Sequence, residues 1–133
     1  MFLKILVIED NLINQRLAAT LFKRLGHDVD VALNGLLGLE LFKKKKYDLI
    51  LMDLQMPVMT GLEAAQAIRE HENKTKEEKR TVIIAVTTFN HHEDRERCIE
   101  SGMNDHISKP YKPADILRLI SQHIPDFHFA HFS

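Results

Sequence analysis

Three acidic residues stand where two apolar runs of the chain end. Asp53 closes the run at residues 49–52 and precedes a turn that contains proline, and Glu9 and Asp10 close another run near the N-terminus. Neighbouring carboxylates repel one another, so such a group is costly unless a cation lies among them. Oxygen ligands with open positions suit Mg²⁺, which takes one or two carboxylates and keeps several waters. The alternative, three unrelated acids facing solvent, is less favoured because all three share a strand-end position.

A hydroxyl and an ammonium group stand at the ends of two further strand candidates. Thr87 ends the apolar run at residues 82–86, and Lys109 follows the short candidate at residues 106–108. An aspartate can attack phosphorus and form an acyl phosphate. Lysine and threonine can bind the phosphoryl oxygens through charge-assisted hydrogen bonds while a cation neutralises the others. This combination favours Asp53 as a phosphoryl acceptor rather than as a metal ligand alone.

The elements that must position these residues alternate between strand and helix patterns. The predicted strands are residues 4–8, 29–32, 49–52, 82–86 and 106–108. The predicted helices are one that Gly26 ends, then residues 35–45, 62–72 and 92–101, and one that Pro113 opens. This alternation predicts an α/β fold, a flavodoxin-like doubly wound (βα)5 sandwich around a five-stranded parallel sheet. In the strand order 2-1-3-4-5 the switch point falls between the first and third strands, which both end in acids.

The composition is that of an ordinary globular domain. The 133 residues, 44% hydrophobic and 28% charged, are enough for one domain with its own core. The net charge of -1 gives no electrostatic case for direct nucleic-acid binding. The single cysteine, Cys98, excludes an internal disulfide, and no apolar run reaches the ~18 residues of a membrane span. We therefore expect a cytoplasmic protein with neither membrane nor nucleic acid as a direct partner.

Two segments are expected to lie outside the core. Residues 73–80 are polar and mixed in charge, which predicts a mobile connecting loop. The folded domain is expected to cover residues 1–124, and residues 125–133 then form a C-terminal tail. The three phenylalanines of the tail either dock on a partner, dock on the domain itself, or belong to a frayed end.

Four stretches of the chain resemble the receiver domain of two-component response regulators. They are Ile8-Glu9-Asp10-Asn11, residues 52–61, Val86-Thr87 and Ser108-Lys109-Pro110, and the resemblance runs from about Leu3 to Ile124. Residues 94–110 look most like receivers attached to, or partnered with, hybrid sensor kinases. The resemblance implies a phosphoacceptor signalling domain, or a part of a larger hybrid histidine kinase, rather than an enzyme with an external substrate.

The resemblance also implies roles for the acidic residues. Asp53 would accept a phosphoryl group from a phosphohistidine on a sensor histidine kinase or a histidine phosphotransfer domain. Glu9, Asp10 and Asp53 would hold Mg²⁺, with Mn²⁺ as a substitute, together with the backbone carbonyl of Gln55. The domain would catalyse its own phosphorylation and its slow dephosphorylation.

The remaining roles concern the switch that phosphorylation drives. Thr87 would turn toward the phosphoryl oxygens, Lys109 would pair with them, and the Lys109–Pro110 peptide bond would be cis. His106 stands where receivers commonly have tyrosine or phenylalanine; its ring either serves the same packing role or makes switching sensitive to pH. Thr60 stands where receivers often have aspartate, at a turn position with little chemical consequence. The surface of the fourth helix, fifth strand and fifth helix would change, bind an unidentified effector, and could form a phosphorylation-linked homodimer.

Two other classes of function fit the sequence less well. A Mg²⁺-dependent phosphatase would need an acid two residues after the nucleophile to protonate the leaving group, and Gln55 cannot do so. A flavin or nucleotide binder would need a loop after the first strand that cradles phosphate on a helix N-terminus. Glu9 and Asp10 would repel a phosphate there.

Overall fold

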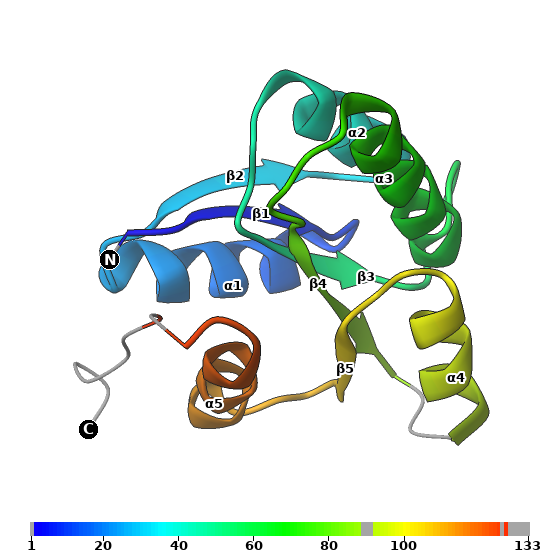
Figure 1. The fold of residues 1–133 in the computed structure, drawn as a ribbon. Helices are drawn as coiled ribbons and strands as arrows, with labels where there is room; N and C mark the ends of the chain where they lie inside the picture. The colour runs from blue at the N-terminus through cyan, green and yellow to red at the C-terminus, as the bar shows by residue number, and fades with distance from the viewer. Residues whose placement is uncertain (1, 89–91, 126, 128–133) are drawn as a thin grey trace.

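The computed structural model describes residues 2–88, 92–125 and 127, and Figure 1 shows a central sheet between two layers of helices. The strands are β1 (Lys4–Ile8), β2 (Asp28–Ala32), β3 (Leu49–Asp53), β4 (Val82–Thr87) and β5 (Asp105–Ser108). The helices are α1 (Leu12–Arg24), α2 (Gly35–Lys44), α3 (Gly61–Thr75), α4 (His92–Glu100) and α5 (Pro113–His123). All strand pairs are parallel, in the order β2-β1-β3-β4-β5. This is the predicted flavodoxin-like doubly wound sandwich.

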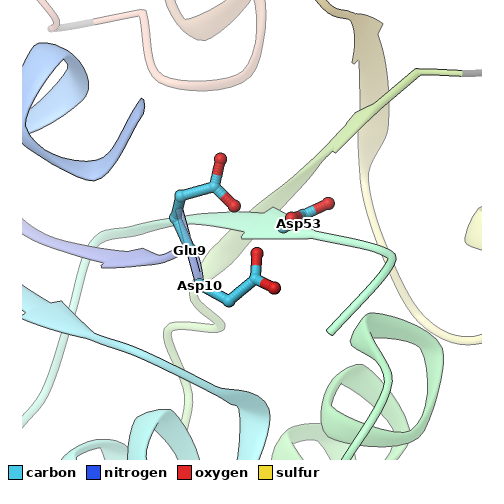
Figure 2. A group of neighbouring side chains, drawn as sticks. All are labelled: Glu9, Asp10 and Asp53. Atoms are coloured by element: carbon cyan, nitrogen blue, oxygen red, sulfur yellow. The ribbon is translucent and has the colours of Figure 1, made fainter. Parts of the chain in front are cut away.

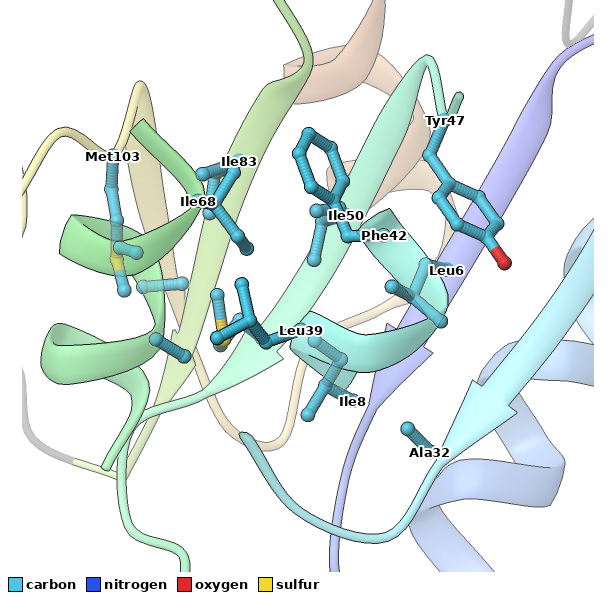
Figure 3. Close-up of a cluster of buried hydrophobic side chains, with 14 of the residues drawn as sticks. Leu6, Ile8, Ala32, Leu39, Phe42, Tyr47, Ile50, Ile68, Ile83 and Met103 are labelled. Atoms are coloured by element: carbon cyan, nitrogen blue, oxygen red, sulfur yellow. The ribbon is translucent and has the colours of Figure 1, made fainter. Parts of the chain in front are cut away.

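The core consists of two apolar clusters, one on each face of the sheet. In β1, Leu6 and Ile8 belong to the cluster under α2, α3 and α4, whereas Ile5 and Val7 belong to the cluster under α1 and α5. Figure 3 shows the first of these clusters. Because both faces of the sheet are covered, the three central strands β1, β3 and β4 read as nearly continuous apolar runs. The edge strands β2 (DVDVA) and β5 (DHIS) do not.

Three helices begin with side-chain caps at the edge where the strands end. Asn11 and Asn34 each accept a hydrogen bond from the backbone N–H three residues further on, at 3.0 and 2.9 Å. Thr60 forms a capping box with Glu63: each side chain accepts a hydrogen bond from the other residue's backbone N–H at 3.2 Å. These caps satisfy backbone groups that a helix start otherwise leaves unpaired, and they fix the three connections that surround the acidic residues.

The third helix runs further than the sequence predicts. Residues 73–75, predicted as the start of a loop, form the last turn of α3. Lys76 then adopts a left-handed conformation, and its N–H donates to the carbonyl oxygen of Glu72. The prediction was wrong for this turn because it relied on a pattern of apolar residues, and the side chains of the turn are polar and exposed. The backbone hydrogen bonds that extend the helix need no such pattern.

An arginine on α3 joins this helix to two distant parts of the sheet. Arg69 donates to the carbonyl oxygens of Gly102 (2.7 Å) and Thr81 (2.8 Å), to the carboxylate of Glu72 (2.6 Å) and to the side-chain oxygen of Asn104 (2.9 Å). Glu72 also accepts the backbone N–H of Thr81 at 2.8 Å, and it is only 2% exposed. We call this set of five residues the Arg69 network.

The two ends of the described chain meet at the edge of the sheet where the strands begin. His27 lies just before β2, and its Nδ1 accepts the backbone N–H of Leu3 at 3.0 Å. Phe127 is buried and stacks on the His27 ring, with centroids 5.0 Å apart. Of the expected tail, Phe127 packs on the domain itself, and residues 126 and 128–133 lie outside the described part. No helix in the described residues is long and apolar enough to span a membrane.

Candidate functional site

The three acids meet at the edge of the sheet where the strands end. Ile8 and Met52 are paired across β1 and β3, so the residues that follow them, Glu9 and Asp53, come out side by side (Figure 2). One carboxylate oxygen from each of Glu9, Asp10 and Asp53 lies within 4.8 Å of the others. Glu9 and Asp53 are buried, at 5% and 7% exposed, whereas Asp10 is exposed.

Lys109 enters this group from the end of β5. Its Nζ lies 2.8 Å from Glu9 Oε1 and 3.4 Å from Asp53 Oδ2. Its backbone N–H donates to the carbonyl oxygen of Thr87 at 2.7 Å, and the peptide bond to Pro110 is cis. One ammonium group therefore pairs with two of the three carboxylates, those of Glu9 and Asp53.

The burial of this group changes the pKa of its members. Burial, followed by the hydrogen bond and the charge of Glu9, raises the pKa of Asp53 to about 6. The charge of Lys109 and the hydrogen bond from the Gln55 N–H oppose this rise only in part. That N–H donates to Asp53 Oδ1 at 3.2 Å. Burial alone would lower the pKa of Lys109, but the two carboxylates outweigh it and raise the pKa. The site thus holds more negative charge than its own lysine balances.

The donor set fits a hard divalent cation. Glu9 Oε2 is buried and finds no hydrogen-bond partner among the described residues, although a buried carboxylate oxygen is costly to leave unpaired. The three clustered carboxylates offer oxygen atoms alone, which is the ligand type that Mg²⁺ prefers. Glu9, Asp10 and Asp53 could therefore hold a magnesium ion, which would pair the orphaned oxygen and offset the excess charge.

Thr87 and His106 lie at different positions along their strands, relative to the edge where the strands end. Thr87 is buried at the end of β4 and follows Val86, the strand partner of Asp53. His106 lies two residues before the end of β5, and its Nδ1 is buried without a hydrogen-bond partner in the described structure. The fold thus brings Thr87 to the edge that holds the acids and Lys109, and it places His106 below that edge.

A cleft of about 580 Å³ opens beside the acidic group, between α1 and the connection from β5 to α5. Apolar residues of the sheet, Val7, Leu51 and Val86, line it together with Asp53 and Lys109. The cleft therefore leads from solvent to the buried carboxylate of Asp53 along a largely apolar wall.

The sequence did not reveal one polar contact at the start of β5, the strand that leads to the site. His123 Nε2 on α5 lies 2.9 Å from Asp105 Oδ2 on β5. The two residues are 18 positions apart, and neither their types nor their spacing distinguishes them from surface residues. The contact joins α5 to the strand that leads to Lys109.

The fold and the site together define a class of α/β domain. In this class a doubly wound parallel sheet brings three carboxylates, a lysine and a threonine to one edge, where one aspartate can contact both a cation and an anion. The chain belongs to the response regulator receiver domain family, whose model matches residues 5–121. It is therefore a receiver domain of two-component signalling.

Its curated relatives are much longer proteins. The chain is 43% identical over 129 residues to hybrid signal transduction histidine kinase B of Dictyostelium discoideum, covering 91% of this chain and 7% of that protein. It is 34% identical over 149 residues to probable histidine kinase 1 of Oryza sativa subsp. indica, covering 92% of this chain and 15% of that protein. The chain thus spans a small part of the relatives that it matches.

Solved structures of receiver domains share the fold. The receiver of a Pseudomonas aeruginosa sensor histidine kinase, with magnesium in its active-site cleft, is 35% identical, with a TM-score of 0.82 and coverage of 95% of this chain and 100% of that one. A Saccharomyces cerevisiae response-regulator receiver, crystallised with its histidine phosphotransfer protein, is 31% identical, with a TM-score of 0.84 and coverage of 91% and 88%.

Proposed function

We propose that Asp53 accepts a phosphoryl group from a phosphohistidine and that Mg²⁺ assists this transfer. The observation that carries the proposal is the geometry around Asp53: a buried carboxylate lies beside two further acids and a single ammonium group. Glu9, Asp10, Asp53 and the backbone carbonyl of Gln55 would hold the ion. When bound, Mg²⁺ would neutralise charge on the phosphoryl oxygens.

The other residues act on the phosphoryl group itself. The ionised Asp53 carboxylate attacks phosphorus, the phosphorus–nitrogen bond of the phosphohistidine breaks, and imidazole leaves with the bonding electron pair. Lys109 Nζ pairs with one phosphoryl oxygen, and the Thr87 hydroxyl donates to another. Both residues already lie at the edge of the sheet that holds Asp53.

The partners follow from the same chemistry. We propose that the donor is a sensor histidine kinase or a histidine phosphotransfer domain, which the complex of the yeast receiver with a histidine phosphotransfer protein supports. A homodimer through α4, β5 and α5, a pH effect at His106, activity with Mn²⁺ and a cytoplasmic location stay predictions.

Labelling with acetyl phosphate and with phosphohistidine proteins tests the proposal. Wild type should incorporate label at one site in the presence of Mg²⁺. No label should be incorporated when EDTA is present during the reaction, and none should be incorporated by the variant Asp53→Asn. Labelling by acetyl phosphate would also support the view that the domain itself catalyses its phosphorylation, since that donor brings no protein. Failure of every donor to label wild type would refute the proposed function.

A further inference from the structure

His27 is a buried histidine that the phosphoryl transfer does not use. It lies just before β2, at the edge of the sheet opposite to Asp53, and is 6% exposed. Its Nδ1 accepts the backbone N–H of Leu3 at 3.0 Å, so the neutral ring must carry its proton on Nε2. That nitrogen is also buried, and it has no hydrogen-bond partner among the described residues. The contacts of the ring therefore select the neutral form and one tautomer.

Phe127 covers one face of this ring. It is 3% exposed, and the two rings stack with a centroid distance of 5.0 Å and an angle of 18° between their planes. The backbone N–H of Phe127 donates to the carbonyl oxygen of Ile124, the residue that ends α5, at 3.0 Å. One histidine side chain thus contacts the residue before β1 and a residue that is tied to the end of α5.

The surroundings of His27 disfavour a charge on its ring. Burial lowers the pKa of His27 below the ordinary value of 6.5, the positive charge at the N-terminus lowers it further, and Asp48 raises it. The Asp48 carboxylate already accepts the backbone N–H of Lys4 at 2.8 Å and pairs with the Lys79 ammonium group at 3.2 Å. The charged side chains nearest in sequence, on α1 and β2, are exposed: Lys23, Arg24 and Asp28. Burial therefore outweighs the attraction of Asp48.

A second proton on the ring is incompatible with these contacts. It would bind to Nδ1, where it would face the N–H of Leu3 and replace a hydrogen bond by two opposed donors. The imidazolium would then hold two buried N–H groups without acceptors, which is costly. A cation–π attraction to the Phe127 ring acts in the opposite direction, but it supplies neither of the missing acceptors.

We propose that His27 is a pH-sensitive latch: its neutral ring holds Leu3 and Phe127, and protonation releases Phe127 and with it the end of α5. Once Phe127 has left, water can solvate the imidazolium. The closed latch is therefore fully favoured above the ordinary pKa and weakens as the pH falls below about 6.5. The ratio of closed to open latch should fall about tenfold between about pH 7.5 and pH 5.5. This inference does not depend on the proposed function.

The first experiment is an NMR titration of the His27 ring in wild type and in Phe127→Ala. Proton binding and the docking of Phe127 must affect one another by the same factor. Removal of the phenylalanine ring exposes His27 to water, so the proton affinity of His27 should rise about tenfold. His71 is the control in the same spectra: it lies on α3, where its ring contacts Phe42, and its titration should be the same in both proteins.

The second experiment measures the hydrogen-exchange protection of the Leu3 amide. In wild type the protection factor should fall about tenfold from about pH 7.5 to pH 5.5. In His27→Asn, whose side-chain oxygen can accept the same N–H but does not titrate, it should not depend on pH. The same fall in His27→Asn and in wild type would overturn the proposal. So would an unchanged proton affinity of His27 in Phe127→Ala, or a lowered one, which would show that the stacked ring favours the imidazolium.

Discussion

Asp53 is held in a place that disfavours its own charge. The carboxylate is buried beside Glu9, and one lysine offsets only part of the repulsion. The same negative potential attracts a cation, so the electrostatic cost in the metal-free domain is linked to metal binding. A bound cation would favour the ionised carboxylate, which is the form that a phosphoryl acceptor needs while an anionic group approaches it.

The raised pKa of Asp53 determines how the stability of the metal-free domain depends on pH. The folded-state pKa of about 6 lies above the ordinary 3.8, so the stabilisation by the bound proton is complete below about pH 4 and is lost as pH rises through 6. Asp53→Asn, which cannot ionise, should exceed wild type in unfolding free energy by about 2 kcal/mol near pH 7.5. Urea denaturation in EDTA measures this difference, which should shrink toward about pH 4.5. A difference independent of pH would contradict the argument.

Lys109 and a bound cation compete for Glu9. The Lys109 ammonium group already pairs with Glu9 Oε1 at 2.8 Å, so a divalent ion at this site must bind against a like charge. Lys109→Met removes that charge and should tighten Mg²⁺ binding about tenfold, as measured by calorimetry. The matched change Lys112→Met, at the exposed start of α5, should leave the affinity close to that of wild type. Weaker binding in Lys109→Met would contradict the competition.

At the scale of elements, the cap of α3 connects the stability of the fold to the site. Thr60 begins the helix that follows the loop from Asp53, so losing its cap should loosen that loop. Thr60→Ala should lower the unfolding free energy by about 1 kcal/mol, whereas Thr60→Ser, which keeps the hydroxyl, should lower it much less. Urea denaturation midpoints of the two variants check this. Equal midpoints for Thr60→Ala and wild type would show that the capping box does not stabilise the helix.

The sequence predicted the elements better than it predicted their ends. All five strands were predicted, and apolar runs located the three central ones, β1, β3 and β4, because a sheet buried on both faces requires them there. The edge strands β2 and β5 carry polar residues as well. The end of α3 and the cap at Thr60 were missed, although the Thr-x-x-Glu spacing of a capping box was visible in the sequence. Thr60 thus has a structural role, as the cap of α3, that the sequence analysis did not assign to it.

The site was predictable to the extent that strand ends define it. Glu9, Asp10, Asp53 and Lys109 come together because parallel strands deliver their last residues to one edge. The contact between Asp105 and His123 was not predictable, since it depends on how α5 packs rather than on a local pattern. The positive φ of Val58, 73°, was equally hidden, because valine does not indicate such a backbone conformation.

At the scale of the whole molecule, the Arg69 network joins parts that are distant in sequence. Arg69→Met would leave the buried carboxylate of Glu72 without its charged partner and should cost about 3 kcal/mol of unfolding free energy. Arg118→Met is the control: its pair with Asp115 is 3.7 Å long and both side chains are more than half exposed, so the cost should stay within about 0.5 kcal/mol. Chemical denaturation of both variants measures the contrast. Similar losses in the two variants would show that burial does not distinguish the two ion pairs.

The meeting of Leu3 and Phe127 at His27 determines how the domain can be attached to other polypeptide. Both residues lie where the strands begin, and Asp53 lies where they end. Polypeptide joined before Leu3 or after Phe127 therefore connects at one edge, while the opposite edge faces an incoming phosphodonor. A linker attached at that edge can therefore be longer or shorter, which changes how far the domain can move from the polypeptide to which it is joined. The linker does not obstruct the access of a donor to the Asp53 carboxylate at the opposite edge.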